Sequence, residues 1–135
     1  MSSMATMLER LALEPLGGDV YTSAHPTERR HVFGGLLIAQ AVRAAQLTVD
    51  RERPVHALHA SFVAAGTGGE PVRYEVERVR DGASFATRRV VARQSGGVVV
   101  VMNADFHRDE DGPEYETPPT MMHTDPPEHT RYRRL

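Results

Sequence analysis

The chain has 135 residues, of which 40% are hydrophobic and 25% are charged, and its formal net charge is −2 at pH 7. These values predict one soluble globular domain, and the small net charge gives no reason to expect a nucleic-acid partner. The sequence has no cysteine, which excludes disulfides, thiolate metal sites and a cysteine nucleophile. No apolar run approaches the length of a membrane span, and the N-terminus is too polar for a secretory signal. We therefore expect a cytoplasmic protein.

The first third of the chain predicts a helix, a strand and a turn. Leucine side chains fall near one face of residues 8–16, which predicts a short helix that Pro15 and the glycines at 17–18 would end. The segment DVYTSA at 19–24 is typical of a short strand, and the polar segment HPTERR at 25–30 is typical of a turn.

The strongest helical signal follows a pair of glycines. Within HVFGGLLIAQAVRAAQLTV, residues 31–49, apolar side chains recur at helical spacing and many of them are alanine. This pattern predicts a helix over 33–49 that is buried on most sides. Its small side chains indicate close packing against a broad surface, which a sheet would provide.

From residue 55 onward the apolar pattern changes to a period of two, which predicts strands. The segments VHALHASFV and VRYEVERV alternate, and SFATRRVVARQ and GGVVVVMNADFH follow after connectors that contain glycine and suit hairpins. Residues 1–109 therefore predict a single domain of the α+β class, with an antiparallel sheet around a central helix. Residues 110–135 are acidic and rich in proline, so we expect an extended or disordered tail.

Several of these segments together resemble one enzyme family. The strings VFGG, AQAV, VHALHASF, VRDGASFATRRVVARQ and ADFH, with EDGPEYE after them, resemble the acyl-CoA thioesterase II family over roughly residues 8–127. The resemblance is to the N-terminal half of the family's double-hotdog chain. It implies a single hotdog fold here, and hydrolysis of acyl-CoA thioesters to fatty acid and coenzyme A without a metal or other cofactor.

The resemblance also implies what this half lacks. The family's catalytic aspartate, hydroxyl residue and glutamine lie in the C-terminal hotdog. The position that matches the aspartate falls near Arg43 here, and the position that matches the glutamine falls near Ala104. Neither side chain supports that chemistry. Two alternatives follow: a thioesterase that works as a homo-oligomer or with a second hotdog domain, or a non-catalytic half that binds acyl-CoA or has a structural role. A hotdog hydratase or dehydratase is a more distant alternative.

Five residues are candidates for catalysis. Gly34, Gly35 and Leu36 stand at the start of the predicted helix, where free N–H groups would stabilise the oxyanion formed in thioester hydrolysis. The alternative is that the glycines only allow a tight turn. The resemblance places His56 near the active cleft as a base or donor, and the alternative is a half-buried histidine bonded to the backbone. Asp105 is a carboxylate in an apolar context, which makes it a candidate general base if the chain works alone.

Four further residues are candidates for substrate binding. Gln40 would hydrogen-bond to a substrate carbonyl or a facing subunit, or be a satisfied buried amide. Asp81 and Ser84 belong to the hairpin turn RDGAS, which the resemblance places close to the paired domain. Arg88 and Arg89 face opposite sides of a strand, so one is solvated and the other, for which we choose Arg88, contacts coenzyme A phosphates or pairs with a carboxylate across an interface.

No metal site is predicted. His56 and His59 are three residues apart on a predicted strand, so their side chains point to opposite faces and cannot share a metal ion.

Overall fold

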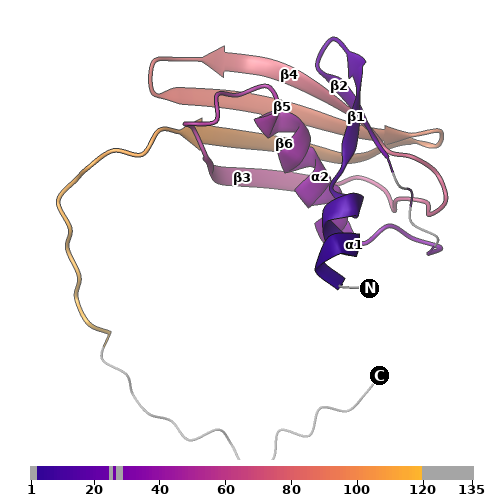
Figure 1. Ribbon diagram of the computed structural model, residues 1–135, viewed down its shortest axis with the longest axis horizontal. Helices are drawn as coiled ribbons and strands as arrows, with labels where there is room; N and C mark the ends of the chain where they lie inside the picture. The colour runs from indigo at the N-terminus through magenta and orange to yellow at the C-terminus, as the bar shows by residue number, and fades with distance from the viewer. Residues whose placement is uncertain (1–2, 25, 27–28, 120–135) are drawn as a thin grey trace, which may run out of the picture.

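The computed structural model describes residues 3–24, 26 and 29–119, which contain two helices and six strands. The elements in chain order are α1 (Ser3–Arg10), β1 (Leu13–Gly17), β2 (Val20–Ser23), α2 (Gly34–Gln46), β3 (Val55–Phe62), β4 (Arg73–Asp81), β5 (Phe85–Gln94) and β6 (Gly97–His107). The strands form one antiparallel sheet in the order β1-β2-β4-β5-β6-β3 (Figure 1). The edges of the sheet are therefore β1 and β3.

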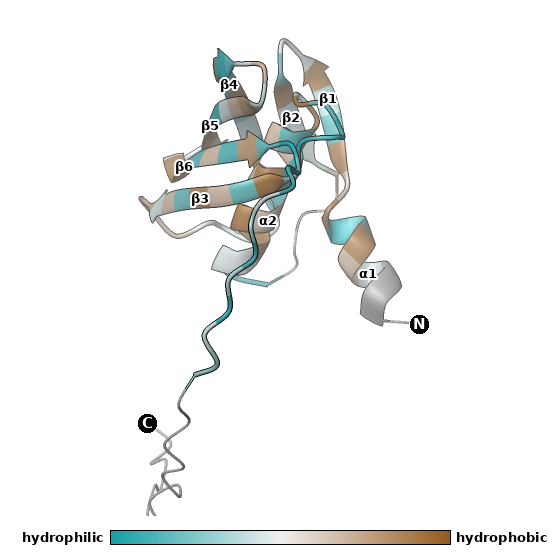
Figure 2. Cartoon of the chain, turned by 90° about the vertical axis from the view of Figure 1, so that its left-hand side faces the viewer, coloured by the Kyte–Doolittle hydropathy of each residue, from teal (hydrophilic) through white to brown (hydrophobic). Residues whose placement is uncertain are grey.

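The helix α2 packs against one face of this sheet and contacts every strand. Its buried stripe consists mainly of Leu37 and the alanines at 41, 44 and 45, whose small side chains let the helix approach the sheet closely. The strands alternate as their sequence predicts, and this shows as hydrophobic and hydrophilic bands along β3 and β6 in Figure 2. The residues of β5 and β6 that meet the helix are Ala86, Val90, Ala92, Val100, Met102, Ala104 and Phe106. The expected architecture, an antiparallel sheet around one central helix, is confirmed.

The prediction of a helix over residues 8–16 is wrong. Helix α1 ends at Arg10, and the segment from Leu13 to Gly17 is strand β1, which pairs with β2. Pro15 is tolerated there because an edge strand does not need every N–H for its ladder. The turn that follows has positive φ at Gly17, Gly18 and Asp19, so the glycines serve a hairpin rather than a helix end. The predicted strand at 19–24 corresponds to β2.

After β6 the chain leaves the sheet. Residues 108–119 form no helix or strand, and their side chains are exposed (Figure 1). This agrees with the expected extended tail, whereas residues 120–135 lie outside the described part of the chain. Within the described residues, neither helix has the length and apolar character needed to cross a membrane.

Candidate functional site

The first turn of α2 has backbone donors without acceptors. Phe33 is the N-cap residue, with extended backbone angles and no side-chain capping bond. Its carbonyl oxygen accepts from the N–H of Leu36 at 3.0 Å and from that of Leu37 at 3.3 Å. Among the described residues, no acceptor is found for the N–H groups of Gly34 and Gly35. These two donors lie at the positive end of the helix dipole.

This geometry changes the expected oxyanion site. The N–H of Leu36 is already bonded within the turn, so the expectation that it is a free donor is wrong. The two glycines keep free N–H groups, and their role in catalysis stays a prediction.

The glycine pair is needed for space rather than for unusual backbone angles. Neither glycine has positive φ. A Cβ atom on Gly34 would lie 3.0 Å from Cε1 of Phe62, and one on Gly35 would lie 2.5 Å from Cε1 of Phe33. Two aromatic rings therefore lie against the first turn of α2. Both rings are exposed, Phe33 by 75% and Phe62 by 59%, so this turn stands at an apolar surface.

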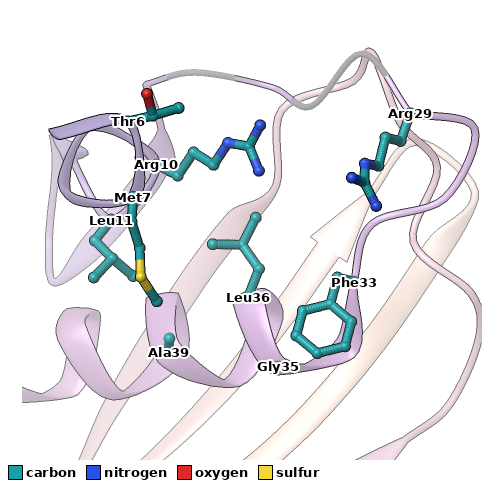
Figure 3. A pocket seen from close by; sticks show the side chains of 9 residues that line it. All are labelled: Thr6, Met7, Arg10, Leu11, Arg29, Phe33, Gly35, Leu36 and Ala39. Atoms are coloured by element: carbon teal, nitrogen blue, oxygen red, sulfur yellow. The ribbon is translucent and has the colours of Figure 1, made fainter. Parts of the chain in front are cut away.

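A groove of about 660 Å³ opens beside this turn, between α1 and α2 (Figure 3). Thr6, Met7, Arg10 and Leu11 line it from the N-terminal side, and Arg29 lines it from the segment before α2. The residues that line it from the start of α2 are Phe33, Gly35, Leu36 and Ala39. The groove thus contains two of the predicted catalytic residues, Gly35 and Leu36.

Gln40 lies close to the groove, but its amide is bonded within the chain. Its Nε2 donates to the backbone oxygen of Arg10 at 2.6 Å, and its Oε1 accepts from the hydroxyl of Tyr74 at 2.5 Å. The side chain is buried, and burial raises the pKa of Tyr74 far above its ordinary value, so this hydroxyl remains a donor. Gln40 therefore ties α1 and β4 to α2, which corresponds to the alternative of a satisfied amide. A substrate contact of Gln40 stays a prediction.

Arg88 is a buried cation with all five of its N–H donors in use. The Nε atom donates to Oγ1 of Thr48 at 2.7 Å, and Nη2 donates to the Thr48 carbonyl at 3.0 Å and to Oδ1 of Asp81 at 2.6 Å. The Nη1 atom donates to the carbonyls of Arg80 and Thr87, both at 3.0 Å. No donor of Arg88 is left for a phosphate, so the predicted contact with coenzyme A is wrong. Arg88 does pair with a carboxylate, but the expected interface is wrong, because the partner is Asp81 of the same chain.

Asp81 and Ser84 lie at the same end of the molecule as Thr48, which follows the C-terminal end of α2. The Ser84 carbonyl accepts from the N–H of Arg108 at 3.3 Å in the β4–β5 hairpin. Because α2 has 13 residues, its two ends are about 20 Å apart. The structure thus separates these residues from the groove at Gly35, and their binding role stays a prediction for a partner at the other end.

His56 and Asp105 lie on the face of the sheet that points away from α2. Asp105 alternates with Ala104 and Phe106, whose side chains are buried against the helix, and its Oδ1 accepts from Thr87 Oγ1 at 2.7 Å. His56 is exposed at a bulge in β3, with ring centroids 5.9 Å from Phe85 and 5.8 Å from His107. In this chain neither side chain reaches the groove, because the sheet lies between them. The expected grouping with the glycines is therefore wrong.

Two arginines of the groove were not found from the sequence. Arg10 and Arg29 are far apart in the chain and come together only because α1 lies beside α2 (Figure 3). The described residues contain no cluster of three or more histidine or carboxylate side chains that could hold a metal ion.

Comparison with known proteins identifies the domain that carries this groove. Residues 21–107 match the model of the family described as "Acyl-CoA thioesterase N-terminal domain". The chain belongs to this family. Acyl-coenzyme A thioesterase 8 of Mus musculus is 43% identical over 106 residues, which are 76% of this chain and 33% of that protein. Acyl-CoA thioesterase 2 of Haemophilus influenzae is 36% identical over 99 residues, or 73% of this chain and 34% of that one.

Solved structures agree with the family and the fold. An acyl-CoA thioesterase II from Mycobacterium marinum superposes with a TM-score of 0.74 at 38% identity, covering 83% of this chain and 42% of that chain. The PaaI protein of E. coli, at 15% identity and a TM-score of 0.65, covers 77% of this chain and 88% of that chain and supports the fold alone. The acyl-CoA thioesterase N-terminal domain described here is thus a hotdog, and it spans about a third of the length of the curated relatives it matches.

Proposed function

We propose that this chain is one half of an acyl-CoA thioesterase, and that it contributes an oxyanion site at the start of α2. In hydrolysis, water adds to the thioester carbonyl carbon, the carbonyl oxygen becomes negative, and the C–S bond then breaks to leave a carboxylate and a thiol. The observation that carries this proposal is the pair of unpaired N–H groups at Gly34 and Gly35 beside an apolar groove. Such donors, aimed at a developing oxyanion, are a large part of catalysis in acyl transfer.

The described lining of the groove contains no group that could activate water. None of the described residues that line it is a carboxylate or a histidine, and His56 and Asp105 lie on the opposite face of the sheet. The proposal therefore takes the general base from another domain or another copy. This supports the proposal that the chain acts with a second hotdog, either a homologous half or a second copy.

The edge strand β3 supports such pairing. Among the strands of the described residues it has no neighbour on its outer side, so its backbone donors and acceptors are available to another strand. Leu58 and Phe62, on the helix side of β3, are exposed by 46% and 59%, and Phe33 extends this apolar surface. A second hotdog placed against β3 would cover these side chains and lie next to the start of α2.

The alternative function is a half that binds acyl-CoA without turning it over. The same observation favours it, because a groove with donors but no base can hold a thioester without hydrolysing it.

The absence of cysteine supports a reducing compartment such as the cytoplasm. In both alternatives the ligand places the protein in fatty-acid metabolism.

Thiol release from acyl-CoA tests the proposal. We expect little or no release by this chain alone, and release when a homologous C-terminal half is added. Gly35→Pro removes one N–H while proline is tolerated in a first helical turn, so the rate of the pair should fall about a hundredfold or more. Gly35→Ala is the matched control, because it adds the same Cβ against Phe33 but keeps the N–H. Equal rates for the two variants would refute the oxyanion site.

A further inference from the structure

The groove between α1 and α2 has apolar walls, and arginine side chains lie at its opening. Its walls are formed mainly by Met7, Leu11, Phe33, Leu36 and Ala39, and its volume of about 660 Å³ is within the usual range for small-molecule sites. Figure 3 shows Arg10 and Arg29 entering from opposite sides above Leu36. Among the described residues, the lining contains the guanidinium group of Arg10 and no carboxylate, so it favours a ligand with an apolar body and an anionic head.

Arg10 is held in place for such a role. Its backbone oxygen accepts the hydrogen bond from Gln40 Nε2, which fixes the C-terminal end of α1 over α2. In the part of the chain that the structure describes, no ion pair involves the Arg10 guanidinium. The cation therefore stands at the groove with its charge available to a ligand. This contrasts with Arg88, whose donors are all used within the chain.

We propose that this groove binds the free fatty acid, with its hydrocarbon chain along Met7, Leu36 and Ala39 and its carboxylate at Arg10. The inference rests on the proposed function for the source of this ligand. Hydrolysis adds the oxygen of water to the acyl carbon, sends a proton to the departing thiolate, and leaves an acid that ionises at neutral pH. The substrate presents a neutral thioester at this point and the product a carboxylate, so Arg10 holds the product more tightly than the acyl end of the substrate. The consequence is inhibition of the assembled enzyme by its own fatty acid.

Calorimetric titration of the 135-residue chain with dodecanoate, below its micelle concentration, tests this inference without any turnover. We expect saturable binding at one site, and weaker binding of dodecanol, which has the same chain without the charge. Arg10→Gln should weaken the affinity of the chain for dodecanoate at least about tenfold. Arg89→Gln is the matched control: Arg89 is an exposed arginine whose neighbour Arg88 is buried against α2, so it lies on the other face of the sheet. Ala39→Phe, which fills the groove from the exposed side of α2, should abolish binding of both ligands.

Other results would overturn the inference. They are equal affinities for dodecanoate and dodecanol, equal effects of Arg10→Gln and Arg89→Gln, or unchanged binding in Ala39→Phe. The inference would also be overturned if coenzyme A alone competed with dodecanoate and the Arg10→Gln variant lost this competition. Arg10 would then bind a phosphate group of coenzyme A. If the chain bound dodecanoate but no pairing hydrolysed acyl-CoA, the proposed function would be contradicted and the fatty-acid site would still be supported. If the pair hydrolysed acyl-CoA but the chain did not bind dodecanoate, the fatty-acid site would be contradicted and the proposed function would still be supported.

Discussion

At the C-terminal end of α2 a buried cation bonds to a residue that follows the helix, whereas at the N-terminal end two backbone N–H groups have no acceptor among the described residues. Thr48 bonds to the carbonyl of Ala45 through its hydroxyl at 2.7 Å, and Arg88 in turn bonds to both the hydroxyl and the carbonyl of Thr48. At the other end Phe33 supplies no capping side chain, the N–H groups of Gly34 and Gly35 have no acceptor among the described residues, and Gly35 lines an open groove.

Under the proposed function, the bonded end of the helix contributes stability and the open end meets the ligand. A helix needs only one firmly bonded end to hold its position on a sheet when its middle is well packed. The unsatisfied end is then available for chemistry, because an incoming oxyanion or carboxylate can take the bonds that the chain does not make. Substitutions at the two ends should therefore differ in what they affect.

The largest effect on stability is expected from Arg88→Met. Methionine would leave the buried carbonyl of Thr48 without its donor, and each unsatisfied buried acceptor costs about 1–3 kcal/mol. We expect the free energy of unfolding to fall by about 3 kcal/mol in urea denaturation. Arg89→Met, the adjacent exposed arginine, should change it by less than about 0.5 kcal/mol. Equal losses would show that the Arg88 network does not anchor the helix.

Tyr74→Phe probes the middle of α2 and should cost about 1–2 kcal/mol, because Gln40 Oε1 loses its donor in a buried position. The same tyrosine predicts a dependence on pH. Burial raises the pKa of Tyr74 in the folded chain above its ordinary value of 10.0, so above that pH the unfolded state binds fewer protons than the folded state. Its contribution to stability is complete below about pH 10 and is lost as the pH rises further. Unfolding measured from about pH 9 to 11 should show this loss in the natural chain and a smaller loss in Tyr74→Phe.

Asp81→Asn separates the charge of the Arg88 network from its hydrogen bonds. The Asp81 side chain is 53% exposed, so solvent screens its pairing with Arg88 and the amide oxygen of asparagine can still accept. We expect a loss below about 1 kcal/mol in urea denaturation, clearly less than that of Arg88→Met. A loss as large as that of Arg88→Met would mean that the ion pair, and not the contacts to Thr48, holds this end.

The smallest effect is expected from Gly35→Ala at the open end. The added Cβ meets only the ring of Phe33, which is 75% exposed and can turn into solvent. Alanine also favours the helix more than glycine. The free energy of unfolding, measured by thermal unfolding, should therefore change by no more than about 1 kcal/mol in either direction. A large loss would show that the Phe33 ring is fixed against the turn and that the groove is closed at this side.

The sequence by itself determined the main parts of the fold. The run of small apolar residues predicted as a helix over 33–49 forms the central helix over 34–46, and the period of two from residue 55 forms the four long strands. These patterns are local, because burial on one face repeats with the period of the element itself. The family resemblance also followed from short motifs within these elements.

Tertiary structure decided what depends on pairing between distant segments. Residues 13–17 became a strand because β2 was available to pair with them, although their leucine pattern also suits a helix. The sequence analysis chose Arg88 rather than Arg89 as the arginine that is not solvated, but only the register with β4 and the position of Thr48 gave Arg88 its partners. Similarly, the strand register put Asp105 and His56 on the far face, and the position of α1 brought Arg10 to the groove. The physical reason is that a period fixes which side chains share a face, whereas only packing fixes which surface each face meets.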